Sequence, residues 1–325
     1  IAQCGRDLFE AAERNGVDFM FEASVGGGIP IITPLKQCLT ANRITEVMGI
    51  VNGTTNYMLT KMTQCGSNYA AVLREAQAKG YAEANPAADV EGLDAARKAA
   101  ILASIAFNTR IGLDDVYVEG ITKITPADIE YATELGYVVK LLAIAREGQN
   151  GVSVRVHPVF LPKDHPLAAV NDVFNAIFIQ GNAIGEAMFY GRGAGSLPTA
   201  SAVVADVVDV VRDIVNHTFG RIGCTCYENK RICPIEETVS AYYIRLLVDD
   251  QPGVLGAIAT AFGDQGVSLN SVIQTRRVDN RAEIVAITHE VVYKKIEQAA
   301  EVLRNLPVVT EIRNIIRVEN GQGAV

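Results

Sequence analysis

Apolar and polar residues along the chain follow two different periods, and segments with each period alternate. Residues 43–51 and 152–160 are rich in β-branched side chains, which is typical of strands. Residues 93–107 are apolar on every side after a charged first turn, which predicts a buried helix. The same reasoning predicts helices over 1–15, 53–61, 126–135 and 200–214, and strands over 17–23, 117–121, 137–146, 173–179 and 187–190. This order predicts an α/β (α+β) fold with an open mixed sheet covered by helices.

A different pattern begins near residue 240. Strands are expected over 243–248, 267–274, 283–288 and 308–318, and helices over 256–264 and from residue 293. The resulting order, βαββαβ in about 80 residues, is that of a ferredoxin-like fold. Its first turn, residues 249–255 with the sequence Asp-Asp-Gln-Pro-Gly-Val-Leu, frees amides at the start of the next helix, which can hold a carboxylate.

The composition is that of an ordinary soluble globular protein, because 49% of the 325 residues are hydrophobic and the formal net charge is −8. The sequence has no basic block to neutralise phosphates, which argues against a nucleic-acid partner. No apolar run reaches about 18 residues and no signal-peptide pattern opens the chain, so neither a membrane span nor secretion is expected.

The six cysteines are few and scattered, which is typical of reduced thiols in a cytoplasmic protein. Cys224, Cys226 and Cys233 cluster, but no fourth zinc ligand lies nearby in the sequence. A redox or metal role for these three therefore stays open.

Candidate chemistry is densest in residues 80–98, where acids lie between glycines and an Asn85-Pro86 turn. Asp94 and Lys98 are four residues apart, so they share one face of the predicted helix near its first turn. Taken alone, such a pair is most often a solvated salt bridge. The buried remainder of the helix favours a cleft at its charged start instead, because buried charge needs a partner or a ligand.

Three other segments place small residues between a strand and a helix. Residues 24–30 contain three consecutive glycines, which permit close approach of the backbone, but no Lys-Ser/Thr follows as in a phosphate-binding P-loop. Residues 52–57 suit either a plain helix cap or the binding of a carboxylate on free amides. Residues 191–195 read Gly-Arg-Gly-Ala-Gly, which is a weak dinucleotide fingerprint because no acid follows about 20 residues later within a βαβ unit.

Residues 80–98 resemble the signature of homoserine dehydrogenases nearly residue for residue, and residues 49–57, Gly-Ile-Val-Asn-Gly-Thr-Thr-Asn-Tyr, are also close to that family. The resemblance covers residues 15–216. It implies the interconversion of L-aspartate 4-semialdehyde and L-homoserine with NADPH or NADH, in threonine, methionine and isoleucine biosynthesis. The last 80 residues resemble the ACT domain, a module that binds amino acids and other small effectors. An ACT domain after the dehydrogenase favours a monofunctional enzyme over a fusion with aspartate kinase.

The resemblance also implies a role for individual residues. Lys98 would stabilise and protonate the developing alkoxide of the substrate, and Asp94 would bind the hydroxyl end. The other implied sites are the substrate residues Glu83, Asp89, Tyr81, Gly53 and Thr54, Gly195 beside the nucleotide, a sodium-like monovalent cation on Glu22, Val25, Gly27 and Ile29, and an effector, expected to be threonine, on Gly253, Val254 and Leu255.

The family further implies a Rossmann domain with a Gly-rich fingerprint and a Thr-Ala-Asn-Lys segment ahead of the part that residues 1–10 resemble. The predicted division is therefore the end of a nucleotide-binding domain (1–15), a catalytic and dimerisation domain (16–216), a linker (217–239) and the ACT domain (240–325). We expect a homodimer or homotetramer, and an isolated 325-residue chain without activity. The alternative is a non-catalytic regulator that binds amino acids through the same two folds, although a buried Lys98 beside an acid favours the enzyme.

Overall fold

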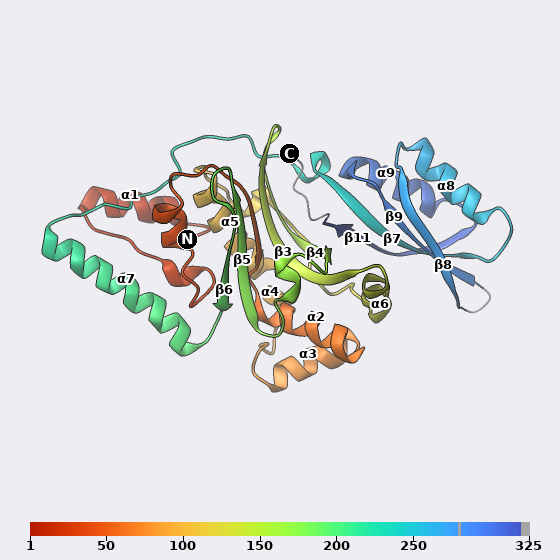
Figure 1. Cartoon of the computed structure of the whole chain (residues 1–325), viewed down its shortest axis with the longest axis horizontal. Coiled ribbons are helices and arrows are strands. Elements are labelled where there is room, and N and C mark those ends of the chain that lie inside the picture. The colour runs from red at the N-terminus through yellow and green to blue at the C-terminus, as the bar shows by residue number, and fades with distance from the viewer. Residues whose placement is uncertain (279–280, 320–325) are drawn as a thin grey trace. The chain divides into compact units, whose positions relative to one another are not determined.

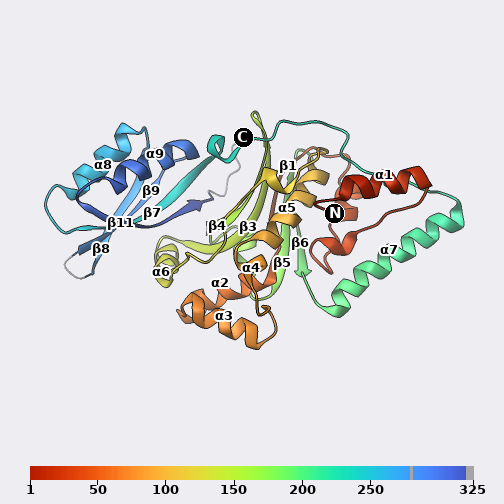
Figure 2. The same cartoon turned by 180° about the vertical axis from the view of Figure 1, so that it is seen from behind.

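The computed structural model describes residues 1–278 and 281–319 (Figures 1 and 2). The chain forms two compact units, each made of several segments. The first unit is Ile1–Thr122, Lys140–His157 and Pro166–Cys233, and the second is Lys123–Val139, Pro158–His165 and Pro234–Val325. The expected mixed α/β architecture is confirmed. None of the helices in the described ranges combines the length and apolar character that a membrane span needs.

The first unit is built on a mixed sheet whose strand order is β6-β5-β1-β3-β4. β1 pairs antiparallel with both β3 and β5, while the short β2 pairs parallel with β4. The bounds of these strands are Ile44–Ile50 (β1), Val116–Val118 (β2), Tyr137–Gly148 (β3), Gly151–Pro162 (β4), Phe174–Gly181 (β5) and Gly185–Arg192 (β6).

Helices cover this sheet, and the most buried of them is α5. Its alanines Ala99, Ala100 and Ala103 are all buried, and such small side chains let the helix lie closely across β1 (Figure 2). The helices of the first unit are α1 (Gly5–Asn15), α2 (Gly53–Cys65), α3 (Tyr69–Ala78), α4 (Ala87–Val90), α5 (Leu93–Ala106) and α7 (Ser196–Asn216), with short 3-10 or π turns η1 (Glu22–Ser24), η2 (Pro34–Cys38), η3 (Leu113–Asp115) and η4 (Pro166–Ala169).

The prediction of a strand over residues 17–23 is wrong. This segment pairs with no strand among the described residues, and its end forms the 3-10 turn η1. Its aromatic rings pack on α1 instead: the ring of Phe9 lies edge-on to Phe19 and Phe21, with centroids 5.3 and 5.5 Å apart. Local aromatic packing therefore buries the alternating apolar residues without a neighbouring strand.

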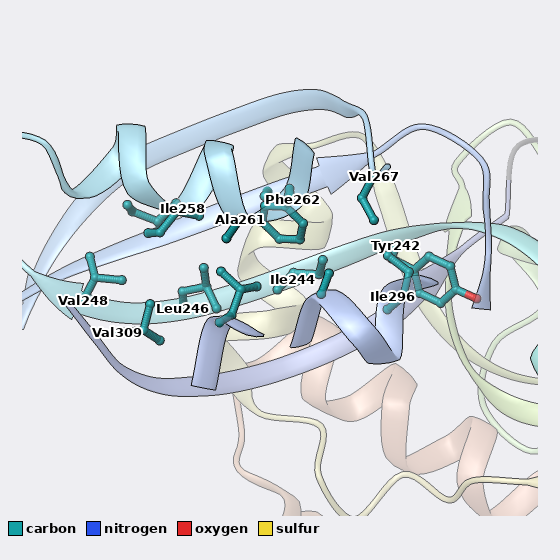
Figure 3. Close-up of a cluster of buried hydrophobic side chains, with 14 of the residues drawn as sticks. Tyr242, Ile244, Leu246, Val248, Ile258, Ala261, Phe262, Val267, Ile296 and Val309 are labelled. Carbon is teal, nitrogen blue, oxygen red and sulfur yellow. The ribbon is translucent and has the colours of Figure 1, made fainter. Parts of the chain in front are cut away.

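The second unit contains the expected βαββαβ order, which is confirmed. Its elements are β7 (Val239–Asp249), α8 (Val254–Asp264), β8 (Leu269–Val278), β9 (Arg281–Thr288), β10 (Val291–Val292), α9 (Tyr293–Arg304) and β11 (Val309–Val318), with the short turn η5 (Ile235–Glu237). The strand order β11-β7-β9-β8 is antiparallel throughout. Figure 3 shows Ile258 and Phe262 of α8 and Ile296 of α9 gathered over the side chains of β7, where they form one buried core.

The second unit also includes α6 (Pro126–Glu134), which precedes the expected ACT domain by about a hundred residues. Asp128 on α6 is fully buried, and its Oδ1 accepts hydrogen bonds from Arg245 Nε at 2.9 Å and from the hydroxyl of Tyr243 at 3.2 Å. Arg245 also pairs with Glu283 at 2.7 Å. Burial and the neighbouring Asp128 raise the pKa of Tyr243, which keeps its hydroxyl a donor. A buried polar network therefore fixes α6 to β7 and β9.

Candidate active site

The candidate site begins at the carboxyl end of β1, where Asn52 starts α2. The Oδ1 of Asn52 accepts the amide N–H of Thr55 at 2.9 Å, so Asn52 is the N-cap of α2. The Nδ2 of the same side chain donates to Asp89 Oδ1 at 2.8 Å and to Asp94 Oδ2 at 2.9 Å. The buried side-chain amide of Asn52 therefore links α2 to α4 and to the first turn of α5. The helices α2 and α4 lie side by side in both views (Figures 1 and 2).

Gly92 brings the two acids together at the corner between α4 and α5. Its φ of +85° lies in the left-handed region, which glycine adopts at little cost. A Cβ at this position would also come within 3.2 Å of Val118 and 3.3 Å of Val156. The tight corner leaves Asp89 before the turn and Asp94 after it within reach of one amide.

Lys98 lies one helical turn after Asp94. Its Nζ donates to Asp94 Oδ2 at 2.7 Å and to the carbonyl oxygen of Val51 at 2.9 Å. The two side chains are only 19% and 30% exposed, so the pair is not a fully solvated surface bridge. Because an ammonium has three N–H donors, one remains beyond the two bonds that the described residues accept. Lys98 can therefore donate to an oxygen of a ligand.

The predicted substrate residues divide into two groups. Thr54 Oγ1 donates to the carbonyl of Tyr81 at 2.6 Å, which places the exposed Tyr81 at the start of α2. Gly53 lies against the carbonyl of Val173, 2.9 Å from where a Cβ would be. Glu83, in contrast, is exposed, and its carboxylate makes no hydrogen bond with any residue that the structure describes. The structure therefore joins Asp89, Asp94 and Lys98 but leaves the carboxylate of Glu83 outside their network.

A buried lysine on β3 forms hydrogen bonds with the first turn of α2. Lys140, on β3, donates from Nζ to the side-chain oxygens of Asn56 and Asn171, each at 3.2 Å, and to the carbonyl of Val170. Burial lowers the pKa of Lys140 to about 8, and the charge of Asp172 opposes this shift. Lys140 and Asn56 thus anchor α2 to the loop before β5.

Two glycine loops pack backbone to backbone near this site. A Cβ on Gly27 would lie 2.4 Å from the carbonyl oxygen of Gly193, and the amide of Gly28 donates to the carbonyl of Arg192 at 3.1 Å. Gly195, the predicted nucleotide contact, is the N-cap of α7 and has a φ of +119°. Residues with side chains could not replace Gly27 without moving the loop 191–195.

One of the predicted cation ligands is a buried acid. Glu22 is 5% exposed, and its carboxylate accepts the amides of Ile31, Ile32 and Thr33 at 2.6, 2.7 and 2.8 Å. The carbonyls of the other three predicted ligands, Val25, Gly27 and Ile29, accept no hydrogen bond from any described residue. These oxygens are hard donors of the kind that alkali and alkaline-earth cations take.

The cysteine cluster does not form a conventional metal site. Burial and the neighbouring Cys224 thiol raise the pKa of Cys226 to about 11, which disfavours the thiolate that binds metals. Among residues 1–278 and 281–319, no group of three or more His, Cys, Asp or Glu side chains is placed to hold a metal ion.

The predicted effector residues lie at the start of α8. Gly253 is its N-cap with a φ of +91°, Val254 is buried, and Leu255 is exposed. The helix begins at residue 254, two residues before the predicted start, and the amide of Val254 donates to the carbonyl of Gln251 at 3.4 Å.

Sequence reasoning identified the acids and Lys98 but gave Asn52 no role beyond a helix cap. Its second role depends on Asp89 and Asp94, which are 37 and 42 residues away. Two features of the sequence could have indicated this role. Asn52 lies at the end of a strand, and Asp89 and Asp94 lie on either side of Gly92.

Comparison with known proteins identifies two families along the chain. Residues 30–208 match the family model described as homoserine dehydrogenase, and residues 242–308 match the ACT domain. A homoserine dehydrogenase of Synechocystis is 48% identical, and the match covers 98% of this chain and 76% of that relative. The crystal structure of a homoserine dehydrogenase from Thiobacillus denitrificans has a TM-score of 0.93 at 41% identity, and the match covers 98% of this chain and 74% of that one.

A more distant structure is a hyperthermophilic archaeal homoserine dehydrogenase mutant in complex with NADPH, with a TM-score of 0.57 and 31% identity over 66% of this chain and 61% of that one. The match to the ACT domain agrees with the βαββαβ unit. The chain therefore belongs to the homoserine dehydrogenase family of NAD(P)-dependent oxidoreductases that act on a CH–OH group, and it carries a C-terminal ACT domain.

Proposed function

We propose that Lys98 is the proton donor in the reduction of L-aspartate 4-semialdehyde to L-homoserine. The observation that carries this role is the partly buried Nζ, held by Asp94 and by the carbonyl of Val51 with one donor left. During reduction, negative charge develops on the aldehyde oxygen, and Lys98 donates first a hydrogen bond and then a proton to it. Groups in such a role contribute about 10²-fold or more to the rate. Asp94 fixes Lys98 and accepts from the hydroxyl of L-homoserine through its second oxygen.

The amino-acid end of the substrate is proposed to lie between the acids and the start of α2. Asp89 is held by Asn52 at 2.8 Å and is thereby oriented to accept the substrate ammonium, with the exposed Glu83 beside it in the sequence. Gly53 and Thr54 lie at the N-terminus of α2, where free amides suit a carboxylate. The ring of Tyr81 closes this end of the site.

The cofactor is proposed to lie along the loop 191–195, beside Gly195. An archaeal homoserine dehydrogenase of similar structure is in complex with NADPH, which supports a dinucleotide as the cofactor. The chain offers one feature that fits it, a buried side-chain oxygen of Asn175 that has no partner among the described residues. When bound, NAD(P)H supplies the hydride.

A sodium-like cation is proposed on the oxygens of Glu22, Val25, Gly27 and Ile29. The hydrogen bonds of Glu22 leave its Oε2 with one donor, and the three carbonyls have none from described residues. A cation there would fix the loop 24–30, and through Gly27 the loop 191–195 that packs on it. Its role is structural.

Threonine is proposed as the effector, with its carboxylate on the amides of Gly253, Val254 and Leu255 at the interface of two ACT domains in a dimer or larger oligomer. The left-handed Gly253 at the start of the eleven-residue helix α8 supports this site. Inhibition requires that threonine bind one of two states of the enzyme more tightly than the other.

The test of the function is oxidation of L-homoserine by the enzyme as its gene encodes it, with NAD⁺ and NADP⁺ compared. We expect formation of NAD(P)H that depends on homoserine and is lost in Lys98→Ala. A protein that binds homoserine in calorimetry but forms no NAD(P)H would support the alternative of a non-catalytic regulator.

A further inference from the structure

Asn175 lies between the two parts of the site that the proposed reaction must bring together. It follows the first residue of β5, where it pairs with Gly191 of β6, the first residue of the glycine loop. On the other side of β5, Ala176 pairs with Ile50 of β1, so Asn175 lies beside Val51, whose carbonyl holds Lys98. Asn175 is therefore one strand away from both the catalytic lysine's anchor and the proposed nucleotide loop.

The side chain of Asn175 contains an unsatisfied acceptor. The residue is 1% exposed, and its buried Oδ1 accepts no hydrogen bond from any residue that the structure describes. Leaving such an oxygen without a partner costs free energy, and buried side-chain polar atoms usually have one. A group that arrives with a ligand is one explanation for an acceptor kept in this state.

The amide of Asn175 lies close to two glycines, where a larger residue would collide with it or touch it. A Cβ on Gly193 would lie 1.9 Å from Nδ2 and 2.2 Å from Cγ of Asn175, so any other residue at 193 would displace the amide. Gly193 does not have a positive φ, so space and not backbone conformation requires glycine there. A Cβ on Gly53 would lie 3.7 Å from Oδ1, which places this oxygen beside the first residue of α2.

We propose that Oδ1 of Asn175 accepts a hydrogen bond from the carboxamide N–H of the nicotinamide and so orients this ring beside Lys98. The inference rests on the proposed function. The reacting end of the cofactor must approach Lys98, where charge develops, and the carboxamide is the one group with N–H donors at that end. The ammonium of the substrate is the competing donor, but the carboxylate of Asp89 is the stronger acceptor for it.

The experiment compares two ligands that differ in the donor alone. The 3-acetylpyridine analogue of NAD(P)⁺ keeps the carbonyl of the carboxamide and replaces its NH₂ by a methyl group. Calorimetric titration gives the ratio of the two Kd values for each variant, and this ratio is independent of turnover. For the unsubstituted enzyme we expect the carboxamide cofactor to bind about threefold to tenfold more tightly than the analogue, the effect of one neutral hydrogen bond.

In Asn175→Leu, which has a similar size but no acceptor, we expect this ratio to fall to about one. Asn175→Asp keeps an acceptor and should retain a ratio above one. Gln180→Leu, on the same strand β5, is the matched control and should keep the original ratio. A packing role alone would weaken both ligands equally in Asn175→Leu.

Two results would overturn the inference: equal binding of both ligands by the unsubstituted enzyme, which needs no variant to fold, or an unchanged ratio in Asn175→Leu. Failure of the proposed function is a separate outcome, because it is the absence of homoserine oxidation whatever the ratio of Kd values.

Discussion

Asn52 and Lys98 share one acceptor, because Oδ2 of Asp94 receives Nδ2 of Asn52 at 2.9 Å and Nζ of Lys98 at 2.7 Å. The helix cap of α2 and the proposed proton donor on α5 are thereby fixed by the same oxygen. A displacement of either residue must change the orientation of the other. The geometry of the proposed proton donor therefore depends on Asn52, which has no proposed part in proton transfer.

Substituting Lys98 by Ala should lower kcat by about 10² or more, because no other described cation is hydrogen-bonded to Asp94. KM for homoserine should change much less. Steady-state kinetics with Lys61→Ala as the control measures this, since Lys61 lies on α2 and contacts the ring of Tyr57 from 5.8 Å without an ion pair. A loss in kcat below about threefold would make the Asp94 and Lys98 pair a structural salt bridge.

Substituting Asn52 by Ser separates the cap from the site. Serine caps helices about as well as asparagine, so the cap itself should change the free energy of unfolding by only about 0.5 kcal/mol. The hydrogen bonds to Asp89 and Asp94 are lost, and kcat/KM should fall by roughly tenfold. Asn68→Ser, at the equivalent cap of α3, is the matched control and should leave kcat/KM unchanged. Equal kinetics for the two variants would contradict a role for Asn52 in positioning the acids.

Lys140 should make stability rise with pH. Burial lowers its folded pKa to about 8 from 10.5. Below pH 8 both states hold the proton and the full cost of burying the charge is present. Between these values the unfolded state binds more protons than the folded state, so the free energy of unfolding increases, by about 3 kcal/mol in total.

Urea unfolding of the enzyme and of Lys140→Met over this pH range isolates the effect of Lys140. Stability of the unsubstituted protein should increase relative to the variant as the pH passes from 8 to 10.5. Asp172, the charged group that faces Lys140, remains in both proteins and cancels in the comparison. A difference that does not vary with pH would mean that Lys140 has no depressed pKa.

Sodium chloride should raise the temperature of unfolding more than choline chloride at the same ionic strength, because a cation that binds only the folded state stabilises it. Glu22→Gln should abolish this difference. Glu46→Gln is the matched control, since Glu46 is similarly buried but pairs with Arg146 at 2.6 Å. Identical unfolding temperatures in both salts would remove the cation from the proposal.

Gly253→Ala should weaken inhibition by threonine, because alanine at a φ of +91° strains the turn that presents the amides. Gly263→Ala, near the end of the same helix and with open space around it, should keep the inhibition. Activity measured against threonine concentration compares them. Unchanged inhibition in Gly253→Ala would place the effector site elsewhere.

Local patterns predicted most of the elements but not the contacts between distant ones. The apolar run after Lys98 gave α5 within one residue, because a buried helix needs no partner to be identified. The strand expected over 17–23 failed because a strand requires an edge to pair with, and the rings of Phe9, Phe19 and Phe21 instead bury one another. Local sequence also does not indicate that Asn52 reaches Asp94.

The contacts of α6 show the same limit. Residues 123–139 read as part of the larger α/β region, yet α6 lies in the second unit. The reason is the pairing of Asp128 with Arg245, which lies 117 residues later in the chain. The pattern of apolar residues within α6 does not indicate that Asp128 pairs with Arg245.

The position of Asp128 determines which residues a stable fragment of the ACT domain must contain. A fragment cut at residue 240 keeps the ion pair of Arg245 with Glu283 but lacks Asp128, the second carboxylate that Arg245 binds. The fragment also loses the hydrogen bonds that Arg245 and Tyr243 donate to Asp128, so it should be less stable than the intact unit. The second unit is discontinuous in sequence, so transferring the ACT domain to another enzyme would require the helix α6 as well.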